Sequence, residues 1–209
     1  MKIIALSVGL LEANCYIGYD EKSKDAMVID PGGDGEYILS KIDEKGLKVR
    51  YIVLTHGHFD HIGATGFLKD KTSGLIAIHK LDAENLRDGD KNLSSSMGIE
   101  LPQLKADLLL EHGSTIKLGD TECKILHTPG HSEGSICILF PGIVFTGDTL
   151  FRGSIGRTDF PGGNYKVLLK SIAENLLTLD DNTVVYPGHG FETSIGIEKE
   201  TNPFLEGLS

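Results

Sequence analysis

The sequence predicts a layered α/β fold in which two β-sheets lie inside and helices cover them. Three observations predict it. Short apolar segments bounded by turn residues recur along the chain, as in strands. In several segments between them, apolar residues recur at helical spacing. Residues 49–54 form a nearly continuous apolar run, typical of a strand buried on both faces. No linker or repeat interrupts the 209 residues, so we expect one domain over residues 1–209.

The N-terminal half is expected to begin with strands and to continue as alternating strands and helices. The breaker Asp30-Pro31-Gly32-Gly33 separates the first strands from a helix in which Tyr37, Ile38 and Ile42 have helical spacing. Residues 89–104 are polar, and we expect a long surface loop or lid there. The predicted strands are residues 5–8, 15–19, 26–29, 49–54 and 75–78, and the predicted helices are residues 35–45, 62–71 and 81–87.

The C-terminal half is expected to contain a run of strands, a glycine-rich loop and two helices. Apolar residues alternate or cluster in short segments between turn residues, which indicates strands. The predicted strands are residues 115–118, 122–126, 135–140, 143–146 and 183–186, the loop is residues 147–163, and the helices are residues 165–177 and 192–200.

Composition and charge exclude several function classes. With 20 Lys and Arg against 30 Asp and Glu, the formal net charge is −10, and such a surface repels phosphate backbones, so nucleic acid is not an expected partner. No apolar stretch is long enough to span a bilayer, and residues 3–11 fit a first strand better than a signal peptide. Cys15, Cys123 and Cys137 are widely spaced and lack a CxxC pair, which indicates a reducing cytoplasm.

The segment Thr55-His56-Gly57-His58-Phe59-Asp60-His61 carries the chemistry. Three histidines and one aspartate fall within six residues. Side chains two positions apart do not share a helix face. His56 and His58 would therefore converge at the end of the preceding strand, where α/β folds place ligands, with Asp60 and His61 on the turn that follows. Four metal-ligand types in one loop exceed what one ion needs, which favours two ions over a metal-free surface cluster.

This segment resembles the THxHxDH signature of the metallo-β-lactamase superfamily. Three further motifs of that family follow in the family's order. They are TPGHS at residues 128–132, FTGDT at residues 145–149 and PGHG at residues 187–190. The resemblance covers nearly the whole chain, and it implies the family's four-layer αβ/βα sandwich.

The resemblance also implies a two-metal site. By the family pattern, His56, His58 and His131 hold the first metal, Asp60, His61 and His189 hold the second, and Asp148 bridges them. Imidazole and carboxylate ligands suit zinc, and also iron or manganese. A pair of such ions lowers the pKa of a bound water to near 7 and polarises a carbonyl. Asp60 and Asp148 are therefore the expected catalytic carboxylates, in a site with two divalent ions per chain.

The loop at residues 146–160 narrows the choice within the superfamily. It resembles the glyoxalase II group, and most of all its short, single-domain members, so we expect a hydroxyacylglutathione hydrolase-like enzyme. Such an enzyme cleaves a small-molecule thioester such as S-lactoylglutathione by a metal-bound hydroxide. The sequence differs from full glyoxalase II in the part that binds glutathione. The chain ends about twenty residues after His189, which leaves no room for the C-terminal helical domain that supplies much of the glutathione pocket in full glyoxalase II.

Other functions stay open at this point. Persulfide dioxygenases share the GRTDF stretch at residues 156–160 and use one iron, two histidines and one aspartate. Hydrolysis of a lactone or another ester is a further alternative. The β-lactamases of the commonest type have cysteine where Asp148 stands, and flavodiiron proteins have glutamate where His58 stands, which disfavours both. A binding module that has lost its activity is disfavoured because all seven ligand positions are filled.

Five further residues need an interpretation. Arg157 and Asp159 either form a substrate-pocket pair near the Asp148 loop or an ion pair that ties the loop down. His79, His112 and His127 are expected to make local hydrogen bonds rather than to bind metal.

Overall fold

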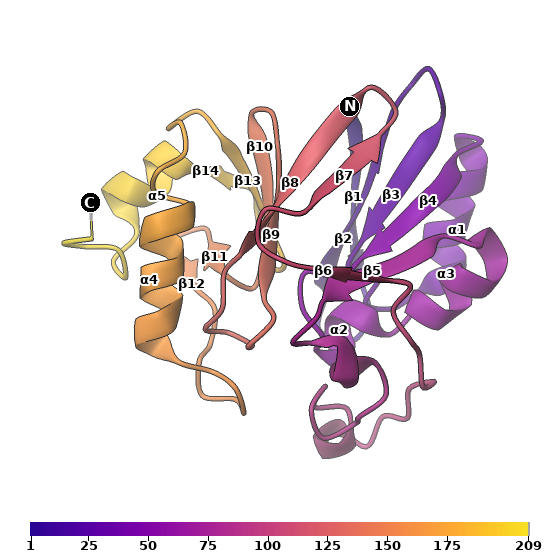
Figure 1. The fold of residues 1–209 in the computed structure, drawn as a ribbon, viewed down its shortest axis with the longest axis horizontal. Helices are drawn as coiled ribbons and strands as arrows, with labels where there is room; N and C mark the ends of the chain where they lie inside the picture. Colours follow the sequence, from indigo (N-terminus) through magenta and orange to yellow (C-terminus); the bar gives the residue numbers. More distant parts are fainter. Residues whose placement is uncertain (209) are drawn as a thin grey trace.

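Two mixed six-stranded sheets face each other in the computed structural model, which describes residues 1–208 (Figure 1). The first sheet has the spatial order β1 (Lys2–Val8), β2 (Ala13–Tyr19), β3 (Asp25–Ile29), β4 (Lys48–Val53), β5 (Leu75–His79), β6 (Leu108–Leu110). The second has the order β14 (Thr193–Ser194), β13 (Val184–Pro187), β10 (Ile143–Gly147), β9 (Ile136–Phe140), β8 (Thr121–His127), β7 (Thr115–Leu118). A small hairpin pairs β11 (Leu150–Phe151) with β12 (Ser154–Ile155).

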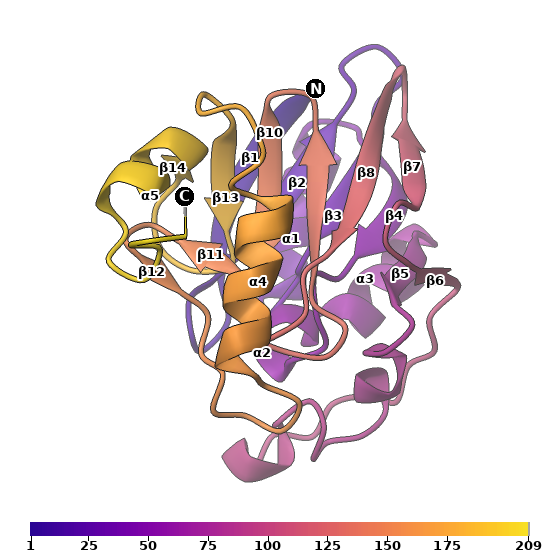
Figure 2. The ribbon, with the colours of Figure 1, turned by 60° about the vertical axis from the view of Figure 1, so that its left-hand side comes forward.

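Helices cover the outer face of each sheet, so the molecule has four layers. Figures 1 and 2 show α1 (Gly35–Glu44) and α3 (Thr65–Thr72) on the first sheet and α4 (Tyr165–Asn175) and α5 (Ile195–Thr201) on the second. The short α2 (Phe59–Ile62) lies at the edge where the two halves meet. This arrangement confirms the predicted αβ/βα sandwich.

The alternation of side chains along the strands builds three apolar layers. In β2, Cys15 and Ile17 pack in the cluster that includes Ile38 of α1, whereas Tyr16 faces the cluster between the sheets. In β9, Ile138 faces the same middle cluster. Because successive strand residues point to opposite faces, one strand contributes to two layers, and both sheets are covered on both faces.

Several strands end at one edge of the molecule. β4 runs parallel to β3 and β5, and β10 runs parallel to β13. β8 has the direction of β10, since both are antiparallel to β9. The carboxyl ends of β4, β8, β10 and β13 lead into the segments 54–58, 128–131, 148–149 and 188–190. All four motifs singled out in the sequence therefore follow strand ends.

Three predicted elements differ from the structure. The predicted helix over residues 62–71 is two helices, because Ala64 N–H donates to the carbonyl of Pro31 instead of continuing α2. Because α2 begins at Phe59, Asp60 and His61 lie inside it and not on a turn before a helix. The segment 81–87 forms only a 3-10 turn, η1 (Ala83–Leu86). The last helix begins at Ile195 and not at residue 192, because β14 pairs with β13 first.

The loops also hold short elements that the sequence did not predict. Residues 147–163, expected as a loop, contain the β11–β12 hairpin. A short edge strand of three residues, β6, is added to the first sheet. Residues 89–104 are the expected long loop with one 3-10 turn, η2 (Ser95–Met97). Within residues 1–208, no helix combines the length and apolar character required to cross a membrane. The three cysteines are buried and free.

Candidate metal centre

The seven predicted ligands come together at the edge where the strands end. His56 and His58 follow β4, Asp60 and His61 lie in α2, His131 follows β8, Asp148 follows β10 and His189 follows β13. Three sets of three side chains offer ligand atoms within 4.8 Å of one another. The first set is His56, His58 and His131, and the second is Asp60, His61 and His189. A third set, His56, His61 and Asp148, takes one histidine from each of the other two.

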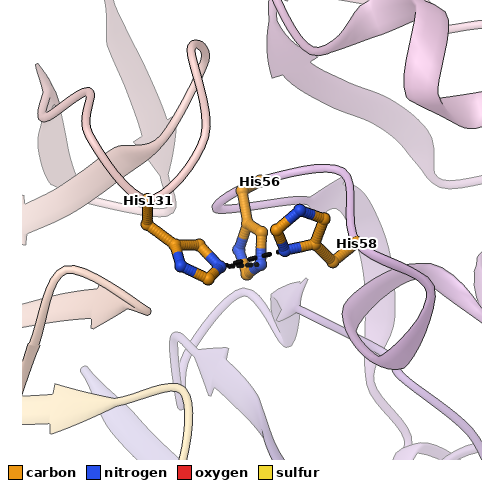
Figure 3. A group of neighbouring side chains, drawn as sticks. All are labelled: His56, His58 and His131. Carbon is orange, nitrogen blue, oxygen red and sulfur yellow. Dashed lines mark hydrogen bonds between the residues drawn. The ribbon is translucent and has the colours of Figure 1, made fainter. Parts of the chain in front are cut away.

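The first set is a convergence of three imidazole nitrogens (Figure 3). The Nδ1 atom of His58 lies 2.9 Å from Nε2 of His131, which lies 3.2 Å from Nε2 of His56. All three residues are at most 4% exposed. Three buried nitrogens aimed at one point cannot all be satisfied by one another, because a neutral imidazole has only one N–H donor.

Asp148 joins the first set to the second. Its Oδ2 lies 3.6 Å from Nε2 of His131 and 3.8 Å from Nε2 of His189, and its Oδ1 lies 3.3 Å from Nε2 of His61. On the other side, Oδ2 of Asp60 lies 3.2 Å from Nε2 of His189 and 3.6 Å from Nε2 of His61. One carboxylate thus reaches both sets, as a bridging ligand would.

Unsatisfied polar atoms test whether these residues fit metal ions. Among residues 1–208, three buried side-chain polar atoms lack a hydrogen-bond partner, and two of them are Nε2 of His61 and Oδ1 of Asp148. Buried polar atoms are rarely left without a partner. Cations between the histidines and carboxylates would satisfy both, so the donor set fits divalent ions.

The protonation states of His56, His58 and Asp148 favour metal binding as well. Burial and the surrounding histidines lower the pKa of His56, and burial together with His131 lowers the pKa of His58 to about 3. Both rings are therefore neutral at pH 7, as metal ligands must be. Burial would raise the pKa of Asp148, but His61 and the other nearby histidines hold it below its usual range. Asp148 is therefore ionised.

Hydrogen-bond acceptors determine which ring nitrogen carries the proton. The carbonyl of Arg157 lies 2.7 Å from Nδ1 of His131, and a carbonyl can only accept, so this nitrogen donates and Nε2 keeps its lone pair. The Oγ1 of Thr55 donates to Asp30 at 2.6 Å and therefore accepts from Nδ1 of His56 at 3.1 Å. Both histidines consequently direct Nε2 into the cluster.

Two buried aspartates that sequence reasoning missed support the ligands. Asp30, at the end of β3, accepts from the backbone and hydroxyl of Thr55 and lies 3.0 Å from Nδ1 of His61. A carboxylate directly after a strand is a readable signal, but the sequence of this segment, Asp30-Pro31-Gly32-Gly33, predicts only a turn. Asp82 accepts from Gly57 N–H, the Ser132 hydroxyl and Gly134 N–H, so it ties the first two motifs together. Nothing in its sequence context indicates this role.

A glycine makes room for the cluster. A Cβ atom on Gly188 would overlap Oδ1 of Asp148 and lie 2.8 Å from Cε1 of His61. The residue before Asp148, Gly147, has a φ of 48°, a conformation that glycine adopts without strain. The glycines of the FTGDT and PGHG motifs therefore serve close packing around the ligands.

A cavity of about 460 Å³ opens over the cluster. Five of the seven clustered residues line it, namely His58, Asp60, His131, Asp148 and His189. Phe160 contacts the first set, with ring centroids 5.5 Å from His58 and 6.0 Å from His131, and Phe151 lies 6.2 Å from His189. A small molecule in this cavity would therefore touch the cluster directly.

Arg157 and Asp159 form an exposed bidentate ion pair, with distances of 2.9 and 2.7 Å. Arg157 also lines the cavity, and its guanidinium lies 4.4 Å from the ring centre of Phe160. The pair therefore joins two residues of the same loop, and its arginine borders the cavity. The other three histidines lie outside the cluster. His79 stacks on His127 at 4.0 Å, His127 contacts the carbonyl of Glu133, and His112 accepts from the backbone of His127.

Comparison with known protein families shows the superfamily to which this chain is related. The model of the metallo-β-lactamase superfamily matches residues 8–189, a stretch that includes the first three motifs, the PGH of the fourth and all seven clustered residues. The chain belongs to the metallo-β-lactamase superfamily. Members of this superfamily with similar full-length sequences include the probable metallo-hydrolase YqgX of Bacillus subtilis, which is 42% identical over all of both chains. The hydroxyacylglutathione hydrolase GloC of Haemophilus influenzae is 38% identical, again over all of both chains.

Solved structures of the superfamily agree with the fold. The B3 metallo-β-lactamase BLEG-1 has a TM-score of 0.94 and 38% identity, over 99% of this chain and all of the other. TTHA1623, described in a di-iron-bound form, has a TM-score of 0.85 and 37% identity, over 97% of this chain and all of the other. The fold and the His/Asp cluster together support divalent metal ions as cofactors of this superfamily member.

Proposed function

We propose that this superfamily member is a metal-dependent hydrolase of small-molecule thioesters such as S-lactoylglutathione. One observation carries the proposal. Two three-residue sets, joined by Asp148, lie at the floor of an open cavity. The similarity to GloC, a hydroxyacylglutathione hydrolase, supports the thioester class. We propose zinc as the ion, with iron or manganese as alternatives, and seven ligands: His56, His58, Asp60, His61, His131, Asp148 and His189.

The protein's own groups suit ester and thioester cleavage. Divalent ions held by the two sets would supply an activated water and polarise the substrate carbonyl. The ionised carboxylates Asp60 and Asp148 offset the repulsion between two such cations. A thiolate leaves without a strong general acid, because its conjugate acid has a pKa of about 8.5. The cavity needs no residue dedicated to protonating the leaving group, which favours a thioester over an amide.

Two other activities have a specific observation in their favour. His56, His131 and Asp148 are close enough to act as a two-histidine, one-carboxylate triad, the iron site that a persulfide dioxygenase needs. The similarity to BLEG-1, named as a B3 metallo-β-lactamase, favours β-lactam hydrolysis as a second candidate, against the expectation drawn from Asp148. Lactones and other esters present the same carbonyl chemistry to the site.

An anaerobic assay separates these activities. Protein reconstituted with zinc, iron or manganese is supplied without oxygen with S-lactoylglutathione, acetyl thioesters, a lactone and a β-lactam. We expect thioester cleavage with zinc and in the absence of oxygen, and its loss after chelation. In a parallel aerobic assay, iron-dependent oxygen uptake with glutathione persulfide, combined with no thioesterase activity under any metal in the anaerobic assay, would overturn the proposal in favour of the dioxygenase.

A further inference from the structure

The cavity over the candidate metal centre is mostly apolar away from its floor. Three loops far apart in the sequence provide this surface, which we call the apolar wall. Its residues are Leu11, Leu93, Met97, Phe151 and Phe160. Leu11 and Met97 are 45% and 49% exposed, so they present apolar surface to the opening instead of burying it in the core. Exposed apolar residues that gather at one site mark a binding surface.

The part of the wall from the long loop is held in place. The carbonyl of Asn92 accepts from the backbone N–H of Phe59 in α2 at 2.9 Å, and the Asn92 side chain donates to the carbonyl of Asn85 at 2.8 Å. Asn92 is only 2% exposed. In Figures 1 and 2 this loop lies beside α2, below the sheets. The loop therefore lines the cavity as a preformed surface joined to the helix that carries Asp60.

Leu93 adopts a strained backbone conformation next to this anchor. Its φ is 68°, in the left-handed region that residues other than glycine, asparagine and aspartate rarely adopt. Such strain persists where the surrounding structure enforces it, and it gathers at ligand sites. Here it holds a leucine side chain in the lining of the cavity, half-buried, where asparagine would fit the backbone better.

The cavity lining offers little charge recognition to an anionic thiol. Among the lining residues, Arg157 is the sole lysine or arginine, and both of its contacts with a carboxylate go to Asp159. The lining carboxylates, Asp60 and Asp148, belong to the metal-binding sets. Glutathione carries two carboxylates, and carboxylates are recognised chiefly by arginine and lysine. No unpaired cation of the lining is available to them.

We propose that the apolar wall binds the hydrocarbon part of the substrate, so that the enzyme selects thioesters by a medium-length apolar acyl chain and not by the thiol. This inference rests on the proposed function, since it names the substrate class of the same site. A chain of several methylenes would pack against Leu93, Met97 and Phe160 while its carbonyl lies at the cluster. The glutathione moiety would add little to recognition.

A chain-length series tests the selection. Acetyl, butyryl, hexanoyl and octanoyl thioesters of N-acetylcysteamine, which is uncharged, are compared with the same acyl groups on glutathione, using zinc-loaded protein. A methylene that becomes fully buried is worth about fourfold in an equilibrium constant. We expect kcat/KM to rise about threefold per methylene up to hexanoyl. We expect glutathione to change kcat/KM by less than about threefold for the same acyl group.

Variants locate the effect. Leu93→Asn suits the left-handed backbone and removes apolar surface, and Met97→Gln keeps the length of the side chain. Each should lower kcat/KM for the hexanoyl thioester about fivefold and change the acetyl value by less than twofold. The matched control is Leu109→Gln, on a strand residue that is 61% exposed and outside the cavity lining. It should leave the whole series unchanged.

A binding measurement separates this inference from the proposed function. Calorimetry of the zinc-loaded protein compares S-methyl and S-hexyl thioethers of N-acetylcysteamine with those of glutathione, none of which can be hydrolysed. If the hexyl compounds bind more tightly but no thioester is hydrolysed, the proposed function is wrong, whereas the proposed binding of a hydrocarbon chain by the apolar wall stands. Thioester hydrolysis with affinities independent of chain length, or S-methylglutathione binding more tightly than S-hexyl-N-acetylcysteamine, would overturn the inference and keep the proposed function.

Discussion

The Nδ1 atom of His61 lies 3.0 Å from Oδ2 of Asp30, and both side chains are at most 2% exposed. The same carboxylate accepts two hydrogen bonds from Thr55, the residue before His56. Burial lowers the pKa of His61, but the charges of Asp148 and Asp30 outweigh it, and the pKa lies above its ordinary value. Asp30 therefore orients His61 so that Nε2 faces Asp60 and Asp148. It is a positioning residue, since it does not belong to either ligand set.

Asp30→Asn should weaken metal binding. The substitution keeps the shape of the side chain but removes the charge and one acceptor, so His61 and Thr55 lose their shared partner. Loss of such a supporting group typically costs 10- to 100-fold in metal affinity. Competition with a zinc indicator measures the change. Asp43→Asn, on the exposed face of α1, is the matched control. Equal zinc affinity in both variants would mean that Asp30 does not position His61.

Replacing Asp148 and replacing His189 should remove different numbers of metal ions, because Asp148 reaches both sets and His189 belongs to the second. Asp148→Ala removes a side chain that reaches both sets and should lower total metal content and turnover together. His189→Ala removes a contact of the second set only and should leave about one ion per chain in the first. Metal content of each purified variant, measured with turnover, distinguishes the two. An equal loss of both ions in both variants would show that the assignment of ligands to sets is wrong.

Gly188→Ala should disturb the cluster through packing alone. The added methyl would overlap Oδ1 of Asp148, so that carboxylate or the loop must move. We expect zinc affinity to fall at least tenfold, because ligand positions shift. Gly18→Ala is the control, since a Cβ there meets only the side chain of Met1, at 3.4 Å. If zinc affinity in Gly188→Ala matched that of the control, the close approach of Gly188 to Asp148 would not matter for metal binding.

The low pKa of His79 is expected to make the free energy of unfolding depend on pH in the acid range. Burial, followed by the neighbouring His127, lowers the pKa of His79 to about 4 in the folded protein, against about 6.5 in the unfolded chain. Because only the unfolded chain takes up this proton between these values, the free energy of unfolding falls as the pH drops from 6.5 to 4. It then levels off.

His79→Asn keeps an acceptor near the backbone N–H of Leu81 and removes the titration. In chelator-treated protein, its free energy of unfolding should therefore fall less steeply than that of the wild type across this window. Denaturant unfolding at several pH values between 7 and 4 measures both. Parallel curves would contradict the assignment of this acid sensitivity to His79.

The clustered ligands were predictable because they follow strand ends. A dense His/Asp motif after an apolar run such as residues 49–54 places its side chains at a sheet edge, whatever the details of the loop. The four layers followed from the same pattern, since β2 and β9 alternate between two apolar clusters. Local sequence and tertiary structure agree in these elements.

The supporting contacts could not be predicted because they depend on tertiary packing. The helix expected over residues 62–71 divides since Ala64 bonds to Pro31, a residue from another strand end. The Asp82 carboxylate holds a 3-10 turn against Gly57 and Gly134, so that a segment with helical spacing does not form an α-helix. The contact between Arg157 and Nδ1 of His131 is made by the backbone carbonyl, so the type of residue at position 157 does not predict it.

Metal content tests the central claim, that the seven clustered residues hold two divalent ions. Protein produced with abundant zinc, iron and manganese, and freed of loosely bound metal by gel filtration, is analysed for metal and for protein by quantitative amino-acid analysis. Two sets of ligands joined by Asp148 predict about two ions per chain. A reproducible value of one ion, unchanged by added metal, would contradict the two-metal site and favour the mononuclear dioxygenase.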